Sequence, residues 1–433
     1  MSELASELDG YLHRLFPLNR SITGNGNRDT LRVLQEIVPL TIHEVPTGTR
    51  VYDWTIPDEW NIHDAWIAAP DGRRIVDLAA CNLHVASYSE PVRGTFRWEE
   101  LRPHLHIHPE LPEAIPYRTF YYRRTWGFCL THAQYRELER LGGPFEVAVV
   151  SELKPGSLTY GELQIPGNSP REILLSCYIC HPSMANDSLS GVLLTAFLAR
   201  DLLRRKHLRN SYRIVFVPET IGAVAYCALN EQAMRRIDMG LVITTVGGPG
   251  RFGYKQSFNG GHAINRLIEE VFEENGIRDY ITYPFDVHGS DERQYSSIGF
   301  RINTATITRD KYYEYPYYHT SLDNLGFVTA GQIAESFGLY RRLIDKIEQE
   351  RRYINLYPDC EVMLSKHDLY PKTGGGQVPR QNEIGQIDCI LWLLFHCDGA
   401  KSLSDIARLT GIPAPSMQEA AAVLEAKGIL KAI

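Results

Sequence analysis

The stretch REILLSCYICHPSMANDSLSGVLLTAFLAR, residues 171–200, decides the fold of this chain. Residues 173–180 form an apolar run without Gly or Pro, which is typical of a strand buried on both faces. The proline at position 182 ends that strand because proline has no N–H to donate. Asn, Asp and Ser at 186–188 are good helix caps, and the apolar run 189–198 follows them. The stretch therefore predicts a buried strand, a loop and a helix.

His181 and Asp187 fall in the loop of this unit. In open α/β sheets, ligands bind at the carboxyl ends of the strands, where this loop is expected. An imidazole and a carboxylate in such a turn could share a metal ion. Alternatively, Asp187 only caps the helix and His181 only ends the strand. The spacing alone leaves both interpretations open.

The rest of the chain repeats the alternation of strand and helix. Further buried-type strands are predicted at 211–217, 239–246 and 301–308, and helices at 262–275 and 328–351. This alternation predicts an α/β fold, a mostly parallel sheet with helices on both faces. We assign residues 1–46 and 119–358 to this domain.

Two further parts depart from that pattern. Residues 47–118 contain short alternating runs, aromatic residues and a Pro-Asp-Gly turn, which predict an inserted β-rich domain. Residues 359–433 include a Gly- and Pro-rich linker after Tyr370, PKTGGGQVPRQ (371–381), and end in the pattern of a winged helix. Its expected recognition helix offers Gln418 and Lys427 against two glutamates, so we expect a module for protein interaction or dimer formation and no nucleic-acid partner.

Composition excludes several classes of function. The net charge of −7 gives no reason to expect a polyanion-binding surface, and no apolar run approaches the ~20 residues of a membrane span. The first residues lack the features of a signal peptide, and eight cysteines are too sparse for a disulfide scaffold. We therefore expect a cytoplasmic protein without a membrane partner, which could form homo-oligomers through the winged helix or the insert. We interpret the Cys177–Cys180 pair as two buried thiols rather than a metal site.

Polar side chains also follow the other predicted strands. Glu219 comes directly after strand 211–217, where a carboxylate can act as a general base. His319 lies in an aromatic run that includes Tyr318. Together with His181 and Asp187 these residues predict a zinc hydrolase site, with two histidines and a carboxylate on the metal and an open position for water.

A third polar cluster lies in the loop FDVHGSDERQY, residues 285–295. It contains Asp291, Glu292 and Arg293 beside a Gly-Ser bend. We predict that these three residues, with Tyr318, contact the substrate.

Three motifs carry a resemblance to a known family. PSMANDSLSGV (182–192), VPETIGA (217–223) and YYHTSLDN (317–324) resemble, in order, the metal and catalytic motifs of co-catalytic zinc aminopeptidases. The resemblance implies that His181, Asp187 and His319 are metal ligands and that Glu219 is the general base.

The chain up to about residue 359 is also similar to a narrower group. Its members are bacterial aminopeptidase-like proteins with an inserted β domain and a C-terminal winged helix, found near genes for polysaccharides or secondary metabolites. LFPLNRSITGNGNRDTL (15–31), PDEWNIHDAWI (57–67) and GSDERQYSS (289–297) carry this similarity.

The chain departs from the zinc aminopeptidase pattern at three positions. The orienting Asp of the family's His-x-Asp is replaced by Ser183, and the second Glu of the Glu-Glu pair by Thr220. Where the family supplies a further Asp ligand, this chain has Thr244 and Thr245. Two close divalent ions need such carboxylates to offset their repulsion, so we expect one zinc ion instead of two. Asp291 could be a further ligand, a partner of a ligand or an anchor for a substrate ammonium group.

The sequence is compatible with two functions. The first is a zinc-dependent hydrolase of aminopeptidase type, acting on a small aminoacyl or peptidyl substrate in polysaccharide or secondary-metabolite biosynthesis. The second is a catalytically reduced relative that binds a ligand or partner, with the winged helix as an interaction module.

Overall fold

A computed structural model describes residues 3–370 and 385–433 of the chain. The chain divides into two compact units. The first extends to residue 343, except for residues 169–171, and the second holds those three residues and the remainder. The candidate site lies entirely within the first unit.

The first unit is built on an eight-stranded sheet with the order β1-β10-β12-β11-β13-β16-β14-β15. Its four central strands, β12, β11, β13 and β16, run parallel to one another, whereas β10 and β14 join them antiparallel. The strands are β1 (Thr41–Pro46), β10 (Ser157–Ile165), β12 (Ser211–Val217), β11 (Glu172–Tyr178), β13 (Met239–Val242), β16 (Asn303–Arg309), β14 (Phe252–Lys255) and β15 (Ile281–Tyr283). The predicted mostly parallel sheet is confirmed.

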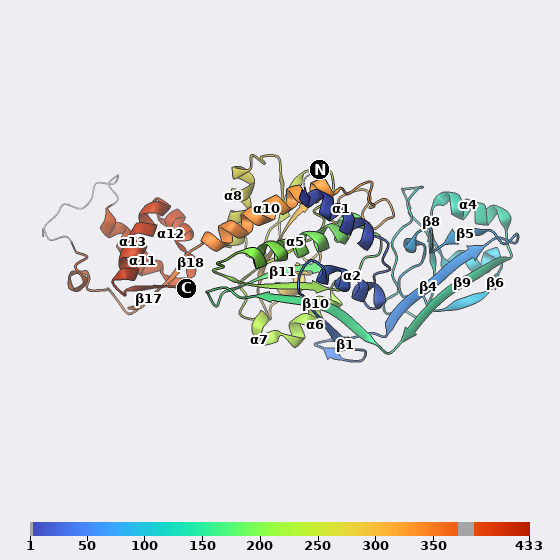
Figure 1. Cartoon of the computed structure of the whole chain (residues 1–433), viewed down its shortest axis with the longest axis horizontal. Coiled ribbons are helices and arrows are strands. Elements are labelled where there is room, and N and C mark those ends of the chain that lie inside the picture. The colour runs from blue at the N-terminus through green and yellow to red at the C-terminus, as the bar shows by residue number, and fades with distance from the viewer. Residues whose placement is uncertain (1–2, 371–384) are drawn as a thin grey trace. The chain divides into compact units, whose positions relative to one another are not determined.

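Helices cover both faces of this sheet, as the alternating pattern predicts (Figure 1). On one side lie α1 (Glu3–Leu15), α2 (Asn25–Gln35), α5 (Gly191–Arg204) and α10 (Ala330–Gln349). On the other lie α6 (Ile221–Leu229) and α7 (Glu231–Met234). The unit β11–α5 is at the centre: every residue from 173 to 178 and from 191 to 199 is buried. Burial on all sides explains why the sequences of β11 and α5 are continuous apolar runs, without the alternation of apolar and polar residues that a half-exposed element shows.

A β-rich lobe extends from this core. Two long antiparallel strands, β4 (Glu59–Ala68) and β9 (Phe145–Lys154), run outward together, with β5 (Arg74–Asp77) and β6 (Val92–Phe96) at their sides (Figure 1). Because β9 pairs along β4, the sheet of the lobe reaches past residue 118, the limit that the sequence suggested. β9 then leads directly into β10 of the central sheet.

The second unit has the predicted winged-helix architecture. A small antiparallel sheet, β18-β17-β19, accompanies three helices. Its elements are β17 (Arg352–Asn355), α11 (Gln386–His396), β18 (Asp398–Ser402), α12 (Leu403–Thr410), α13 (Ala414–Ala426) and β19 (Leu430–Ala432). The unit begins before residue 359 because β17 is its central strand. The predicted linker, residues 371–381, lies outside the described residues. Within the described residues, none of the helices has the length and apolar character needed to cross a bilayer.

Candidate metal centre

The candidate site forms where four neighbouring parallel strands end. His181 follows β11, Glu219 follows β12 and Thr244 follows β13. His319 lies in the loop between β16 and α10. These strands are adjacent in the sheet, so their loops meet at one edge, as the topology of open α/β sheets requires.

His181, Asp187 and His319 come together in this edge, as the sequence predicts. One ligand atom from each lies within 4.8 Å of the others. His181 Nδ1 is 3.7 Å from Asp187 Oδ1, and His319 Nε2 is 3.1 Å from Asp187 Oδ2. Asp187 is fully buried in the π-helical turn η3 (Ala185–Ser190) that precedes α5. The residues converge although up to 138 positions separate them.

The donor atoms of this group fit a divalent cation. His181 Nδ1, Asp187 Oδ2 and His319 Nε2 are buried, and none makes a hydrogen bond with any residue that the structure describes. Burial lowers the pKa of His181 to about 4, so its imidazole is neutral and has a lone pair to donate. Burial alone would raise the pKa of Asp187, but the two histidines outweigh it and the pKa is lowered. Two imidazoles and a carboxylate are a ligand set that suits zinc.

Two residues that the sequence analysis did not identify, Asp323 and Tyr178, support Asp187. The carboxylate of Asp323 accepts hydrogen bonds from the N–H groups of Asn186, at 2.6 Å, and of Asp187, at 2.9 Å. The Tyr178 hydroxyl donates to Asp187 Oδ1 and accepts a bond from the Thr244 hydroxyl at 2.7 Å. Both lie inside stretches quoted above, but nothing in their spacing indicates which side chain they contact. Such support orients a ligand and tunes the metal it binds.

The loops around the site also carry local backbone strain. Ser183, Thr220, Thr245 and His319 have positive φ values of 38°, 62°, 50° and 54°. Non-glycine residues rarely adopt this conformation, least of all β-branched ones. Outliers of this kind cluster at functional sites, where surrounding structure holds them in place.

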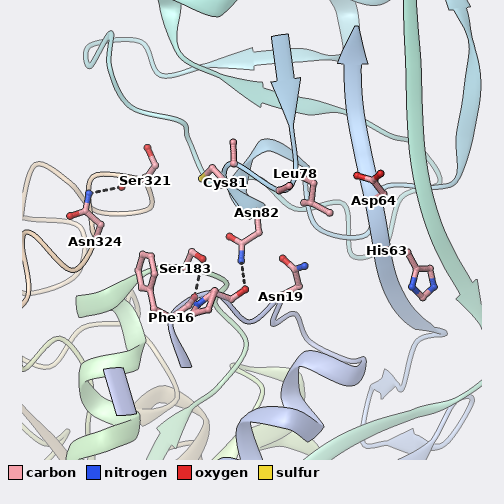
Figure 2. Close-up of a pocket in the computed structure, with 13 residues that line it drawn as sticks. Phe16, Asn19, His63, Asp64, Leu78, Cys81, Asn82, Ser183, Ser321 and Asn324 are labelled. Carbon is pink, nitrogen blue, oxygen red and sulfur yellow. Dashed lines mark hydrogen bonds between the residues drawn. The ribbon is translucent and has the colours of Figure 1, made fainter. Parts of the chain in front are cut away.

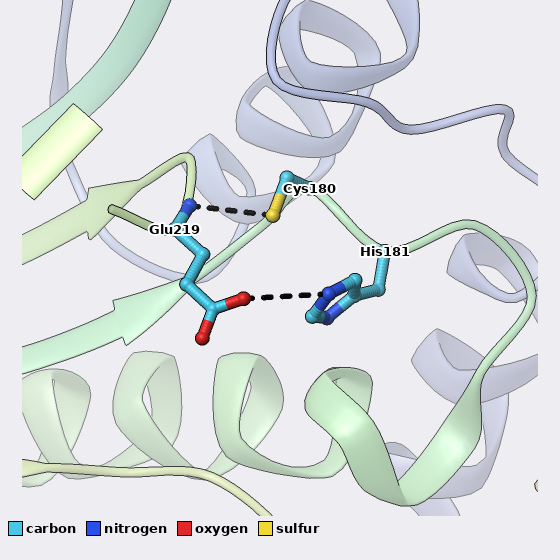
Figure 3. A group of neighbouring side chains, drawn as sticks. All are labelled: Cys180, His181 and Glu219. Atoms are coloured by element: carbon cyan, nitrogen blue, oxygen red, sulfur yellow. Dashed lines mark hydrogen bonds and ion pairs between the residues drawn. The ribbon is translucent and has the colours of Figure 1, made fainter. Parts of the chain in front are cut away.

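Glu219 faces His181 at this edge of the sheet (Figure 3). Its Oε2 is 3.5 Å from His181 Nε2, and its Oε1 accepts a hydrogen bond of 2.8 Å from the Ser290 hydroxyl. Burial, reinforced by the charge of Asp187, raises the pKa of Glu219 to about 7. Cys180 is buried here and its Sγ accepts the Glu219 N–H at 3.3 Å, so this thiol of the predicted pair touches the site.

Most of the residues predicted to contact the substrate do not line the cavity at the site. Asp291 is buried and its Oδ1 accepts the Thr220 N–H at 2.7 Å, so it lies behind Thr220. Glu292 is also buried, and its Oε1 accepts bonds from Lys255 and from the Tyr312 hydroxyl. Tyr318 stacks on His319 with ring centroids 3.9 Å apart. Of the four, only Arg293 lines the cavity at the site.

This cavity, which we call the inner pocket, has a volume of about 330 Å³. The candidate residues His181, Glu219 and His319 form part of its wall. Four further lining residues are aromatic, namely Trp54 and, from the lobe, Tyr117, Tyr121 and Tyr122. Tyr117 meets both imidazoles edge to face, with ring centroids 5.4 Å from His181 and 5.2 Å from His319. The lobe therefore supplies one wall of the pocket.

A separate cavity of about 420 Å³ lies between the core and the lobe (Figure 2). Ser183 and Ser321 line it, each two residues from a candidate ligand, but none of the candidate residues does. His104, in the lobe, stacks on Trp126 with ring centroids 3.7 Å apart and bonds to the Trp126 carbonyl oxygen.

The buried carboxyls predict how the metal-free protein responds to pH. Burial raises the pKa values of Glu219 and Asp323 to about 7 and holds that of Asp291 well above its usual range. Above about pH 4.5 these three carboxyls hold protons that the unfolded chain has released, so their contribution makes stability fall as pH rises toward 7. His181, whose pKa is lowered to about 4, acts in the opposite direction below about pH 6.5, but with one proton against three. Each retained proton contributes a slope of about 1.4 kcal/mol per pH unit.

Urea unfolding at pH 5.5 and pH 7.5 measures this effect. With a chelator present, the free energy of unfolding should be lower at pH 7.5, and saturating zinc should remove the difference because a cation favours the ionised carboxylates. Asp291→Asn should reduce the slope in chelator. A metal-free protein that gains stability over this interval would contradict the pKa assignments.

Comparisons with known proteins place the chain in a family. A family model described as "Domain of unknown function (DUF4910)" matches residues 10–350, and a "winged helix-turn-helix" model matches residues 351–432. A Clostridium acetobutylicum protein is 42% identical over 432 residues, covering 100% of this chain and 98% of that protein. Its name mentions polysaccharide biosynthesis and an aminopeptidase-like domain.

Solved structures agree with this placement. A crystal structure of a candidate peptidase from Clostridium acetobutylicum aligns with a TM-score of 0.82 and 41% identity, covering 100% of this chain and 97% of that one. A zinc aminopeptidase from Bacillus subtilis aligns with a TM-score of 0.56 and 11% identity over 79% of this chain and 94% of that one. The second likeness concerns the fold alone.

Proposed function

The chain belongs to the family described as a domain of unknown function, DUF4910, with an aminopeptidase-like fold, and we propose that it is a zinc-dependent amide hydrolase of aminopeptidase type. One observation carries the proposal: three buried donor atoms, from His181, Asp187 and His319, face one another without hydrogen bonds among the described residues. Buried donor atoms without hydrogen bonds cost free energy, and a bound cation would remove this cost.

His181, Asp187 and His319 would hold the ion. Zinc in such a site supplies Lewis-acid chemistry, because it lowers the pKa of a bound water and polarises a carbonyl group. Asp323 and Tyr178 keep the Asp187 carboxylate in place. The edge contacts of Tyr117 fix the planes of both imidazoles.

Glu219 is the proposed general base. Ser290 holds its Oε1, which leaves Oε2 directed toward His181 at the wall of the inner pocket. From there Oε2 takes a proton from the attacking water and returns it to the leaving amine. A base works best when its pKa lies near the operating pH, and the pKa of Glu219 is about 7.

The substrate we propose is a small aminoacyl or peptidyl amide. The aromatic wall of the inner pocket favours an apolar or flat acyl part, since Tyr117 and Tyr121 line it beside Glu219. The name of the Clostridium acetobutylicum relative supports a role in polysaccharide biosynthesis.

A panel of aminoacyl amides tests the proposal. We expect zinc-loaded protein to hydrolyse at least one member, chelator to abolish the turnover, and added zinc to restore it. Stoichiometric zinc without hydrolysis of any amide in the panel would instead favour a protein that binds a ligand without cutting it.

We further propose that the site holds one ion. Asp187 Oδ1 is already occupied by the Tyr178 hydroxyl, which in turn accepts a bond from Thr244. Only Oδ2 remains for a metal. A neutral phenol and a threonine thus stand where a second divalent ion would need a carboxylate to offset its charge.

Replacing Tyr178 and Thr244 should change the number of ions that the site binds. We expect the double variant Tyr178→Phe/Thr244→Asp to bind a second Co²⁺ ion per chain, whereas Tyr178→Phe alone still binds one, about 10- to 100-fold more weakly because Asp187 loses its supporting donor. Titration followed by absorption of Co²⁺ counts the ions. Two ions in the unmodified protein would contradict the assignment.

A further inference from the structure

The inner pocket continues into a second hollow, which we call the outer groove. This groove has a volume of about 470 Å³ and shares Trp54, Thr220 and Arg293 with the inner pocket. A molecule longer than the inner pocket can therefore extend from the metal site along the groove to Arg301 at its wall.

The charged side chains that line the outer groove are all positive. Among the residues that the structure describes, Arg293 and Arg301 line it and no acidic side chain does, although the chain has a net charge of −7. Both arginines are exposed, and neither guanidinium has an ion pair or hydrogen bond with a residue in the described ranges. Unpaired guanidinium groups beside a cavity bind carboxylate and phosphate through charge-assisted hydrogen bonds.

Contacts with neighbouring residues hold the surroundings of both arginines in place. Arg293 belongs to the short helix α9 (Glu292–Tyr295), whose two end residues are buried. Glu292 Oε1 accepts a bond of 2.9 Å from Lys255, and the Tyr295 hydroxyl lies 2.8 Å from the Ser176 hydroxyl. The Arg301 guanidinium lies 5.2 Å from the centroid of the Phe258 ring. Fixed supports reduce the entropy that is lost when an anion binds.

We propose that the substrate carries an anionic group, a phosphate or a carboxylate, on the part that leaves after cleavage. This inference rests on the proposed hydrolase function for the direction of the substrate. The acyl part occupies the aromatic inner pocket, and the leaving part passes Trp54 into the outer groove. Exposed Val287 and Ile298 contact its apolar portion, and Arg293 and Arg301 bind its anion.

Binding of amines that resemble the leaving part tests the proposal without turnover. The probes are 4-aminophenyl phosphate, 4-aminobenzoate and the neutral 4-aminobenzamide, titrated calorimetrically into the zinc-loaded protein at millimolar concentrations. An exposed ion pair changes affinity by up to about five-fold, so we expect the two arginines together to favour an anionic probe by about ten-fold. Which anion binds more tightly identifies the chemical class.

Matched variants test whether Arg293 and Arg301 cause the preference for an anionic probe. Arg293→Gln/Arg301→Gln should abolish it, whereas Arg278→Gln, which removes an exposed arginine outside both cavities, should retain it. Equal binding of all three probes, no binding of the anionic ones, or a preference that survives the double substitution would overturn the proposal. A protein that binds the anionic amines but cleaves no amide would support the groove and contradict the hydrolase, so the two failures are distinguishable.

Discussion

Replacing Glu219 by Gln should reduce kcat on the best aminoacyl amide by about 10²- to 10⁴-fold, the usual contribution of a positioned general base. The amide keeps the size of the side chain and the Ser290 contact at Oε1 but cannot accept a proton at Oε2. Zinc content and KM should change little, because Glu219 is not one of the three proposed ligands. Steady-state kinetics and metal analysis of the same preparation measure both quantities.

Two controls keep this result specific. Glu231→Gln alters a partly exposed glutamate that pairs with Arg235 and should leave kcat unchanged. Glu219→Asp keeps the carboxylate but shortens its reach, so we expect intermediate activity. Full activity in Glu219→Gln would remove the residue from the mechanism, whereas loss of zinc together with activity would make it a ligand.

His319→Ala should abolish hydrolysis and weaken zinc binding by more than the roughly 10- to 100-fold that follows loss of an outer-shell partner. The variant removes one of three donors and leaves the buried Asp187 carboxylate without its 3.1 Å neighbour. A competition assay with a chromophoric chelator measures the affinity.

His13→Ala is the matched control, since His13 is an exposed histidine on α1. It should bind zinc like the unmodified chain. Unchanged zinc affinity in His319→Ala would exclude the residue from the site and remove the reason for its convergence with His181.

Much of the fold follows from local pattern. Residues 173–178 and 212–217 are buried on both faces, so their apolar runs identify strands without any knowledge of their neighbours. Once those strands are parallel, the loops after them must meet, and the meeting of His181, Asp187 and His319 follows from topology.

Contacts between distant side chains were not predictable in the same way. Asp323 holds the turn at Asp187 across 136 positions, and only the folded chain shows it. Asp291 and Glu292 read as exposed loop residues, yet Lys255 and Tyr312 enclose Glu292, and Thr220 covers Asp291. The extent of the lobe was not predictable for a related reason, because β9 pairs with β4 between residues that are 78 to 95 positions apart.

The most direct test of the account is anomalous X-ray scattering at the zinc edge from crystals of the zinc-loaded protein. We predict one peak per chain, bounded by His181 Nδ1, Asp187 Oδ2 and His319 Nε2. No peak at this position, or a peak coordinated by other residues, would contradict the central claim that these three residues bind the ion on which catalysis depends.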